Sequence, residues 1–450
     1  MAKTRFEVRD VVHGFTYHDR LEKLVIDSPP FQRLRSIHQL AMCYQVYPGA
    51  THRRFEHSLG VMELAGRIFD ALFGSIENID AAVRDRISEQ LTPSAKDYWR
   101  RVVRMAALLH DVGHLPFSHA AEAELLPKGC SHETVTADII RNSVIKDILN
   151  SERPPINVED VVRIACDEEA RGGDPLTPWE AILNEIITGR TFGADRMDYL
   201  LRDSYHTGVA YGRFDPDRLI GGLRLVIQPD NEEIAIALEA GSIQSSEALL
   251  LARYFMYSQV YFHKTRRSYD IHLKDFMIAW LKSADLPEDW YRWNHINGLT
   301  DDEVMTALRL SSADSSHAHH GLATRLVGRK HFRMAYALDQ QQLELIPALL
   351  TEVSEEAVRL YGAENVRVDK YGPKSEINDF CVRMSESPES EVRSSLQVSG
   401  VISAIPAFLI GYIFVAPDLA LKARPELNAF AQQKLELARA QKRQQASGIQ

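Results

Sequence analysis

The spacing of apolar residues along the chain predicts a mainly helical protein. From Phe31 to about residue 282, apolar residues stand three and four positions apart, which places them on one face of an α-helix. The segments with this spacing are 59–72, 100–110, 117–126, 179–188 and 195–205, two shorter helices around the Pro154–Pro155 break within 141–167, and a long helix from about 245 to 282.

Other segments have the pattern of extended chain. Residues 1–25 look extended, and residues 223–228 and 233–238 alternate on either side of ProAspAsn, which predicts a β-hairpin. Beyond Asp285, short helices and a strand-rich stretch with Gly and Pro follow, and a polar surface helix ends the chain. We therefore expect two domains, a mainly helical one over residues 1–285 and a smaller mixed α/β region over 286–450.

The apolar run at 401–415 raises the question of a membrane segment. It contains Pro406 and Gly411, and it is shorter than the about 20 apolar residues that a membrane helix needs. We expect buried strands in this run and no association with a membrane.

Composition and charge narrow the classes of function. Of the 450 residues, 45% are hydrophobic and 25% charged, as in an ordinary globular protein. The four cysteines form no CxxC pair and the N-terminus has no apolar signal-peptide core, so we expect reduced thiols and a cytoplasmic location. The net charge of −10 disfavours binding to nucleic acid, but an arginine cluster near the motifs below suits an anionic small substrate.

A metal site is predicted where His110 and Asp111 stand side by side at the end of an apolar helix. Such a pair alone is common without a metal, but His57 and Asp195, from other helices, would complete a set of two histidines and two carboxylates. This mixed set suits Mn, Fe, Co, Ni or Zn and accepts Mg. Four protein ligands leave coordination positions for water and a phosphate oxygen, as a Lewis-acid hydrolase requires.

Four sequence blocks carry a resemblance to a known family. They are FQRLR at 31–35, YPGATHRRFEHSLGV at 47–61, HDVGHLPFSH at 110–119 and DRMDYLLRD at 195–203. With the ordered His, His-Asp and Asp set, they resemble the HD-domain deoxynucleoside triphosphate triphosphohydrolases, which have bacterial dGTPase-like and vertebrate members. The resemblance runs from about Asp10 to Lys282 and implies an HD helical core that releases a deoxynucleoside and intact tripolyphosphate.

The resemblance assigns roles to residues of this chain. It makes His57, His110, Asp111 and Asp195 the metal ligands and matches phosphate-contacting positions at Arg54, Arg196, Tyr199 and Arg253. Arginine forks fit phosphate oxygens bidentately.

Protonation of the leaving oxygen is expected to fall to His114. It follows His110 by four residues, and a histidine near a dication and a triphosphate can donate a proton at neutral pH. His119 and His132 are expected to support the catalytic water and its relay. Glu122 stands where the vertebrate enzyme has an aspartate, so the reach of this carboxylate differs.

Sugar and base recognition are also implied by the resemblance. Gln39, Leu40 and Asp203 match positions that bind the sugar, with Gln39 and Asp203 on the 3′-hydroxyl. Tyr261 matches a tyrosine against C2′, where a ring excludes ribose. Tyr257 replaces a histidine near the base, so base preference does not carry over.

A nucleotide activator and an oligomer are further implications of the resemblance. Asp27, Gln32 and Arg35 match an activating guanine-nucleotide site, and Arg329 and Arg333 resemble phosphate contacts of an adjoining site, whereas Phe6 stands where a lysine is expected. Relatives assemble, so we expect a homo-oligomer such as a dimer or tetramer. Two alternatives stay open: an HD hydrolase of nucleoside monophosphates, alarmones or cyclic dinucleotides, and a non-catalytic nucleotide sensor.

Overall fold

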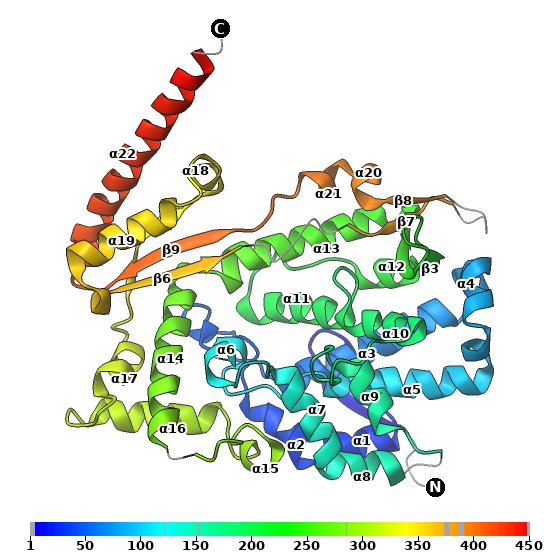
Figure 1. Ribbon diagram of the computed structural model, residues 1–450. Helices are drawn as coiled ribbons and strands as arrows, with labels where there is room; N and C mark the ends of the chain where they lie inside the picture. The colour runs from blue at the N-terminus through cyan, green and yellow to red at the C-terminus, as the bar shows by residue number, and fades with distance from the viewer. Residues whose placement is uncertain are drawn as a thin grey trace. The chain divides into compact units, whose positions relative to one another are not determined.

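The expected fold class is confirmed by the computed structural model. It is mainly α, with a helical core, a β-hairpin and a mixed α/β region toward the C-terminus (Figure 1). The structure describes residues 5–120, 122–151, 154–284, 286–372, 379–385 and 391–447.

The chain folds into two compact units, each built from several segments. Unit 1 comprises Met1–Met256, Asp285–Val304 and Ile377–Ile405, and unit 2 comprises Tyr257–Ala284, Met305–Glu376 and Pro406–Gln450. The chain therefore passes from one packing unit to the other more than once. The division into functional domains after residue 285 stays a prediction.

Unit 1 carries the helices expected around the metal motifs except over 117–126, where Phe117 and Ser118 have positive φ and the described residues form a 3-10 turn at Ser118–Ala120 and a short helix at Glu122–Leu125. Its helices include α1 (Arg20–Ile26), α2 (Pro29–Gln32), α3 (Arg54–Phe73), α4 (Ala81–Arg86), α5 (Pro93–Leu109), α6 (Glu122–Leu125), α7 (His132–Asn142), α8 (Val144–Ser151), α9 (Val158–Ala165), α10 (Pro178–Thr188), α11 (Ala194–Thr207), α12 (Pro216–Gly221), α13 (Ile243–Met256), α15 (Trp293–Ile296), α20 (Ser395–Val398) and α21 (Gly400–Ala404). α3 packs against both α5 and α11, and α10 packs against α9 and α11 (Figure 1).

Local sequence explains where the three central helices begin and end. α5 starts at Pro93 after Thr92, whose hydroxyl accepts a hydrogen bond from the amide of Ala95. In α3, the Glu56 side chain accepts from the amide of Arg53, which satisfies one free donor of the first turn. α11 ends at Gly208 with a φ of 78°, a left-handed conformation that glycine adopts without strain.

Small sheets flank the helices of unit 1. The N-terminal extended segment forms an antiparallel hairpin of β1 (Phe6–Asp10) and β2 (Gly14–His18). The expected second hairpin is β3 (Leu223–Ile227) with β4 (Ile234–Glu239), which is therefore confirmed. It belongs to a four-stranded sheet of order β3-β4-β7-β8, completed by β7 (Cys381–Arg383) and β8 (Val392–Ser394).

The long helix expected from 245 to 282 is interrupted. α13 ends at Met256, Tyr257–Tyr261 form a π-helical turn, and α14 (Lys264–Ser283) begins after His263. The apolar periodicity continues through the turn, so it does not show the change in hydrogen-bond register. π-helical turns within helices are frequent at functional sites, and this one carries Tyr257 and Tyr261.

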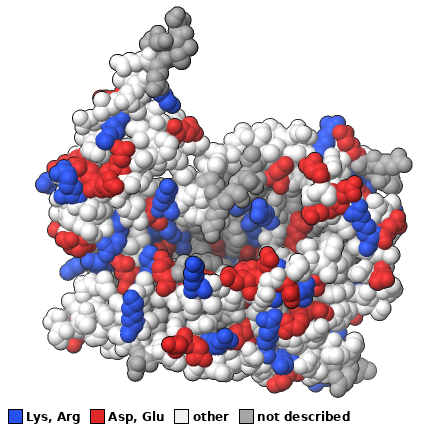
Figure 2. Space-filling model, viewed as in Figure 1, with Lys and Arg blue, Asp and Glu red and all other residues white. Residues whose placement is uncertain are grey.

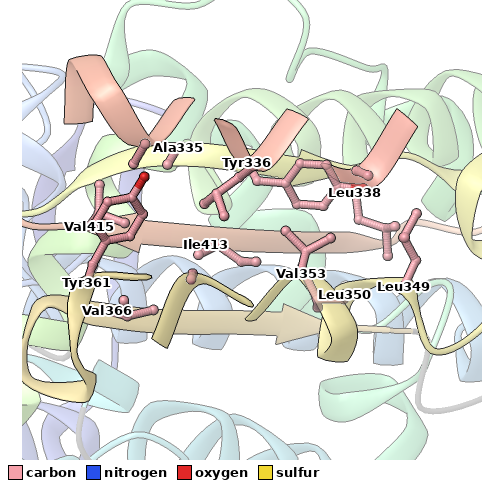
Figure 3. Packing of buried hydrophobic residues seen from close by; sticks show 14 of the residues in the cluster. Ala335, Tyr336, Leu338, Leu349, Leu350, Val353, Tyr361, Val366, Ile413 and Val415 are labelled. Carbon is pink, nitrogen blue, oxygen red and sulfur yellow. The ribbon is translucent and has the colours of Figure 1, made fainter. Parts of the chain in front are cut away.

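Unit 2 holds a three-stranded antiparallel sheet covered by helices. The strand order is β5-β9-β6, formed by β5 (Arg333–Leu338), β9 (Ile410–Val415) and β6 (Val366–Tyr371). Figure 3 shows the apolar cluster that the sheet shares with α19 (Leu349–Tyr361) and α22 (Ala420–Ser447), with Ile413 of β9 at its centre. Among the described residues, this unit also holds α14, α17 (His320–Val327) and α18 (Gln340–Leu345), and α16 (Asp301–Ala313) spans the boundary with unit 1.

The apolar run at 401–415 is half strand rather than strand throughout. Residues Gly400–Ala404 form the short helix α21 of unit 1, and only Ile410–Val415 form a strand, the central β9 of unit 2. Pro406 between them removes a backbone donor and ends the regular structure. Within the described ranges, no helix combines the length and the hydrophobicity needed to cross a bilayer.

Charged side chains are mixed on the visible surface. Figure 2 shows acidic and basic residues interspersed over that face. Because opposite charges alternate over short distances, their fields largely cancel beyond about 10 Å at physiological salt.

Candidate metal centre

Three helices bring the four predicted ligands together in unit 1. His57 lies in the first turn of α3, His110 and Asp111 follow α5 directly, and Asp195 lies in the first turn of α11. His57 Nε2 is 3.1 Å from Asp195 Oδ1 and 3.5 Å from Asp111 Oδ2. His110 Nε2 is 3.4 Å from Asp111 Oδ1 and 3.7 Å from Asp195 Oδ1. His57, His110 and Asp195 thus form one group, and Asp111, which adjoins them, also groups with His114 and His132.

The donor set fits a divalent cation. One ligand atom each from His57, His110 and Asp195 lies within 4.8 Å of the others. The Nδ1 of His110 hydrogen-bonds with the carbonyl of Ala107 at 2.7 Å, and its buried Nε2 has no hydrogen-bond partner among the described residues. A buried nitrogen that faces two carboxylates but forms no hydrogen bond with either is suited to binding a metal ion.

A buried network behind His57 was not assigned from the sequence. Asp198 Oδ2 accepts a hydrogen bond from His57 Nδ1 at 2.8 Å, and Asp198 Oδ1 lies 2.6 Å from His13 Nε2. Arg202 bonds both oxygens of Asp198 and also Asp10, at 2.8–2.9 Å. Because the His57 Nδ1 is engaged here, its Nε2 points to the other ligands, as carboxylate–histidine pairs do at metal sites.

Glycine is required where α3 meets this network. A Cβ on Gly60 would lie 1.9 Å from Asp198 Oδ1 and 2.5 Å from an Arg202 nitrogen. The Gly60 of FEHSLGV therefore permits the close approach of α3 and α11. The signal in the sequence was the second aspartate of DRMD, one helical turn after the ligand Asp195, together with the arginine four residues later.

Carboxylates set the protonation of the centre. Burial lowers the pKa of His57, but hydrogen bonds with Asp195 and Asp198 outweigh burial and raise the pKa to about 10. Burial raises the pKa of Asp111, but the Arg54 guanidinium beside it holds that pKa well below its ordinary value. A cation that binds here must displace the proton of His57, since only neutral imidazole ligates metals.

Arg54 contacts the centre directly. Its Nη1 hydrogen-bonds with Asp111, and its Nε donates to Ser118 Oγ at 2.7 Å. The side chain is buried, so it does not have the solvated surface position that is the ordinary one for arginine. Its position at the edge of the centre suits a phosphate group next to the metal.

Two stacked histidines form the second part of the site. The rings of His114 and His132 lie 4.0 Å apart between centroids at 10°. His114 Nε2 is 3.1 Å from Asp111 Oδ1, and His132 Nδ1 is 2.7 Å from Glu122 Oε1. The glutamate therefore reaches its expected histidine despite its longer arm. The side chain of His119 lies outside the described residues.

The pKa values of the two histidines shift in opposite directions, and the shifts favour the proton on His132. Burial and the nearby Arg54 place the pKa of His114 well below its ordinary value. Burial also lowers the pKa of His132, but Glu122 outweighs it and raises the pKa. Gly113 permits this packing, because a Cβ there would lie 2.3 Å from the His132 carbonyl.

Another histidine links the two residues expected to hold the sugar. The amide of Gln39 donates to the carbonyl of His52 at 3.1 Å, and His52 Nε2 lies 2.7 Å from Asp203 Oδ1. The ring of His52 also stacks on His206 at 4.4 Å. His52 stands in the quoted THRRFEH block without a role from the sequence, and the structure gives it the contact with Asp203.

The remaining substrate positions fall in both units. Asp195, Tyr199 and Asp203 are four residues apart, which places them on one face of α11. Arg196 follows Asp195 in the same helix, Leu40 follows Gln39, and Arg253 lies in α13, which packs against α11. Tyr257 and Tyr261 lie in unit 2 with their rings 5.3 Å apart, edge to face.

The predicted activator residues form one cluster in unit 1 and a pair in unit 2. Gln32 Nε2 donates to the carbonyl of Ile26, and Arg35 Nε donates to Gln32 Oε1 at 2.8 Å. Asp27 caps α1 and pairs with Lys23. Arg329 and Arg333 flank His331 in unit 2. Their activator role stays a prediction.

Comparison with known proteins identifies the family. The HD domain pattern matches residues 54–200, and the HD associated region matches 214–371. The crystal structure of a hypothetical protein from Aquifex aeolicus is 33% identical, with a TM-score of 0.75 over 94% of this chain and 100% of that one. The chain belongs to the HD-domain family.

Curated relatives of this HD-domain protein include characterised enzymes. An uncharacterized protein of Methanocaldococcus jannaschii is 36% identical over 62% of this chain and 51% of its own length. The deoxynucleoside triphosphate triphosphohydrolase SAMHD1 of Homo sapiens is 31% identical over 62% of this chain and 45% of its own length. The chain spans about half the length of such relatives. The HD-domain family recognised from the sequence is confirmed.

Asp198→Asn tests whether the buried network orients His57. We expect the purified variant to bind manganese about 10–100-fold more weakly than the unmodified protein, because an amide is a poorer acceptor for His57 Nδ1 and frees the ring to turn. Equilibrium dialysis with metal analysis measures this. His13→Ala, which removes one contact of Asp198, should weaken binding less.

The matched control is Asp147→Asn, an exposed aspartate of α8. Equal manganese affinity in Asp198→Asn, in His13→Ala and in this control would show that the network supports folding alone.

Proposed function

We propose that this protein hydrolyses deoxynucleoside triphosphates to a deoxynucleoside and tripolyphosphate. The observation that carries the proposal is the convergence of His57, His110, Asp111 and Asp195 beside Arg54 and the His114–His132 pair. Relatives that are deoxynucleoside triphosphate triphosphohydrolases, at about 30% identity, support the choice of substrate. The bond to be cleaved joins the 5′ oxygen to the α-phosphorus.

The residues divide the work of this reaction. A divalent ion held by the four ligands would supply Lewis acidity for an α-phosphate oxygen and for water. Arg54, already fixed by Ser118 and Asp111, is placed to bind phosphate oxygens with its guanidinium. Arg196 and Arg253 would neutralise charge on the remaining phosphates.

Proton delivery to the leaving oxygen is assigned to His114. Burial and then Arg54 lower the pKa of His114, and a triphosphate bound at that arginine would oppose the effect of Arg54 and favour the imidazolium. His132, whose proton Glu122 stabilises, lies against the ring of His114 and keeps a second positive charge near the leaving oxygen. The arrangement serves general acid catalysis.

Sugar recognition is assigned to the surroundings of His52. The side-chain oxygen of Gln39 is buried without a hydrogen-bond partner among the described residues, so it can accept from a hydroxyl. Asp203, held by His52, offers a carboxylate to the same hydroxyl. Tyr261 would close the space beside C2′.

Product analysis tests the proposal as a whole. The purified protein is incubated with each dNTP and NTP plus manganese, and products are separated by chromatography. Deoxynucleoside and tripolyphosphate are expected in equal amounts. Orthophosphate or pyrophosphate, or activity on monophosphates, alarmones or cyclic dinucleotides alone, would favour another HD hydrolase.

Loss of a metal ligand should abolish hydrolysis without unfolding the protein. We expect His110→Ala and Asp195→Ala to lose bound metal and dNTP hydrolysis together, because each removes one donor of the set. Metal analysis, circular dichroism and product assays measure this, with Asp147→Asn as control. Full activity in either variant would refute the metal assignment.

His114→Ala tests the proton donor. We expect kcat to fall by about 10²–10⁴ with little change in substrate affinity, because the imidazole acts on the leaving oxygen in the transition state. Steady-state kinetics and a binding assay with a non-hydrolysable dNTP analogue separate the two effects. Weak binding with normal turnover at saturation would make His114 a binding residue.

Tyr261→Ala tests the sugar assignment. The unmodified protein should discriminate against ribonucleotides, because a 2′-hydroxyl would be buried unpaired at about 1–3 kcal/mol, a factor of roughly 5–150. The variant should narrow the ratio of kcat/KM between dGTP and GTP and lower the absolute rate, with any activator nucleotide held constant. Equal hydrolysis of both by the unmodified protein would contradict deoxynucleotide specificity.

A further inference from the structure

A buried aspartate outside the HD domain match contacts two loops of the site. Asp301 begins α16 and is 1% exposed. Its Oδ1 accepts a hydrogen bond from the amide of Phe117 at 2.6 Å. Its Oδ2 accepts from the amide of His38 at 2.8 Å and hydrogen-bonds with the ring Nδ1 of His38 at 2.6 Å. One carboxylate therefore joins three segments of unit 1 that are far apart in sequence.

The loop that contains Phe117 has an unfavourable backbone. Phe117 and Ser118 have φ values of 57° and 59°, the left-handed region that side chains other than glycine rarely adopt. Two such residues in succession persist only where surrounding contacts over-determine them. Here those contacts are two hydrogen bonds. The Phe117 amide donates to the Asp301 carboxylate, and the Ser118 hydroxyl donates to the His38 carbonyl at 2.9 Å.

The path of this loop decides where the histidine pair lies. The loop joins His114 to α6, which carries Glu122, the partner of His132. Arg33 supports its start, since Nη2 donates to the carbonyl of His114 at 2.8 Å and to the carbonyl of Leu299 at 2.9 Å. The segment 299–301 is therefore linked to this loop twice, by Asp301 at Phe117 and through Arg33 at His114.

The other loop that Asp301 holds leads to the sugar residues. His38 immediately precedes Gln39, and its ring stacks parallel to the ring of Phe117 with centroids 6.1 Å apart at 3°. Displacing the Asp301 carboxylate would release both the proton-donor loop and the Gln39 loop. No ligand of the metal is contacted by Asp301 among the described residues.

We propose that Asp301 is a positioning residue, which holds the His114–Glu122 loop and the His38–Gln39 loop in the arrangement that hydrolysis needs. It acts through backbone and ring contacts and touches no reacting atom. The roles of His114 and Gln39 in this inference rest on the proposed function. The contacts and the strained turn stand on geometry alone.

Asp301→Asn is the sharpest variant, because it keeps the shape and removes one acceptor. Three donors converge on the two carboxylate oxygens of Asp301. In the variant, the side-chain NH2 of asparagine replaces one of these oxygens, so at least one donor faces another donor and loses its acceptor. We expect faster hydrogen exchange in the peptides 36–42 and 112–120, unchanged metal content, and a kcat lowered about 10²-fold, the scale of a misplaced catalytic group. KM should change far less than kcat.

Asp302→Asn is the matched control, since this neighbour is exposed and should leave kcat and exchange unchanged. His38→Ala provides a milder variant in case Asp301→Asn does not fold. It removes the hydrogen bond of the His38 ring to Asp301 and the stacking of that ring on Phe117, but it leaves the two backbone hydrogen bonds to Asp301. A smaller fall in kcat and a smaller rise in hydrogen exchange are therefore expected.

Two outcomes would overturn the inference. One is unchanged exchange in both peptides, whatever the substrate of the enzyme. The other is a lower melting temperature with an unchanged kcat below it, which is the behaviour of a purely structural residue. Failure of the proposed function is a separate result, since it would appear as an unmodified protein that hydrolyses no dNTP.

Discussion

The hydrogen bonds to the buried carboxylate of Asp198 are the interactions on which the candidate metal centre depends. An isolated charge in the interior costs several kcal/mol, so Asp198 is tolerable only with its full set of donors. Arg202, His13 and His57 supply them. The bond from His57 Nδ1 leaves Nε2 as the only ring atom that can face the other ligands. The orientation of a metal ligand is thus decided by a charge that cannot reach the metal itself.

Electrostatic balance also governs the two stacked histidines. Arg54 lowers the pKa of the buried His114, while Glu122 raises the pKa of His132 against the effect of burial. Two adjacent imidazolium rings would repel each other, and the carboxylate beside His114, Asp111, is also paired with Arg54, so the pKa shifts favour the proton on His132. A polyanion bound at Arg54 would shift this balance toward His114. The site is therefore set to change protonation with the substrate that it is proposed to cleave.

Both organising carboxylates tie the HD domain to chain segments outside it. The HD match covers residues 54–200 and includes every proposed metal ligand. Yet Asp198 is satisfied by Arg202 and the N-terminal hairpin, and the loop after His114 is held by Asp301. Residues outside the match thereby hold Asp198, which contacts His57, and the Phe117 amide in the loop after His114. A segment limited to the match would contain the proposed metal ligands and His114 but leave Asp198 without Arg202 and the Phe117 amide without Asp301.

The sequence by itself determined the helical class and the β3–β4 hairpin, and it named the four residues proposed as metal ligands. Helical periodicity and the His-Asp pair are local patterns, and the motif blocks were specific enough to indicate the family. The interruption at Tyr257–Tyr261 was not visible, because a π-helical turn changes hydrogen bonds without changing residue spacing. The roles of His13, His52, Asp198 and Asp301 were decided only by the tertiary structure. A buried polar side chain is defined by the partners that satisfy it, and here those partners lie up to 263 positions away in the chain.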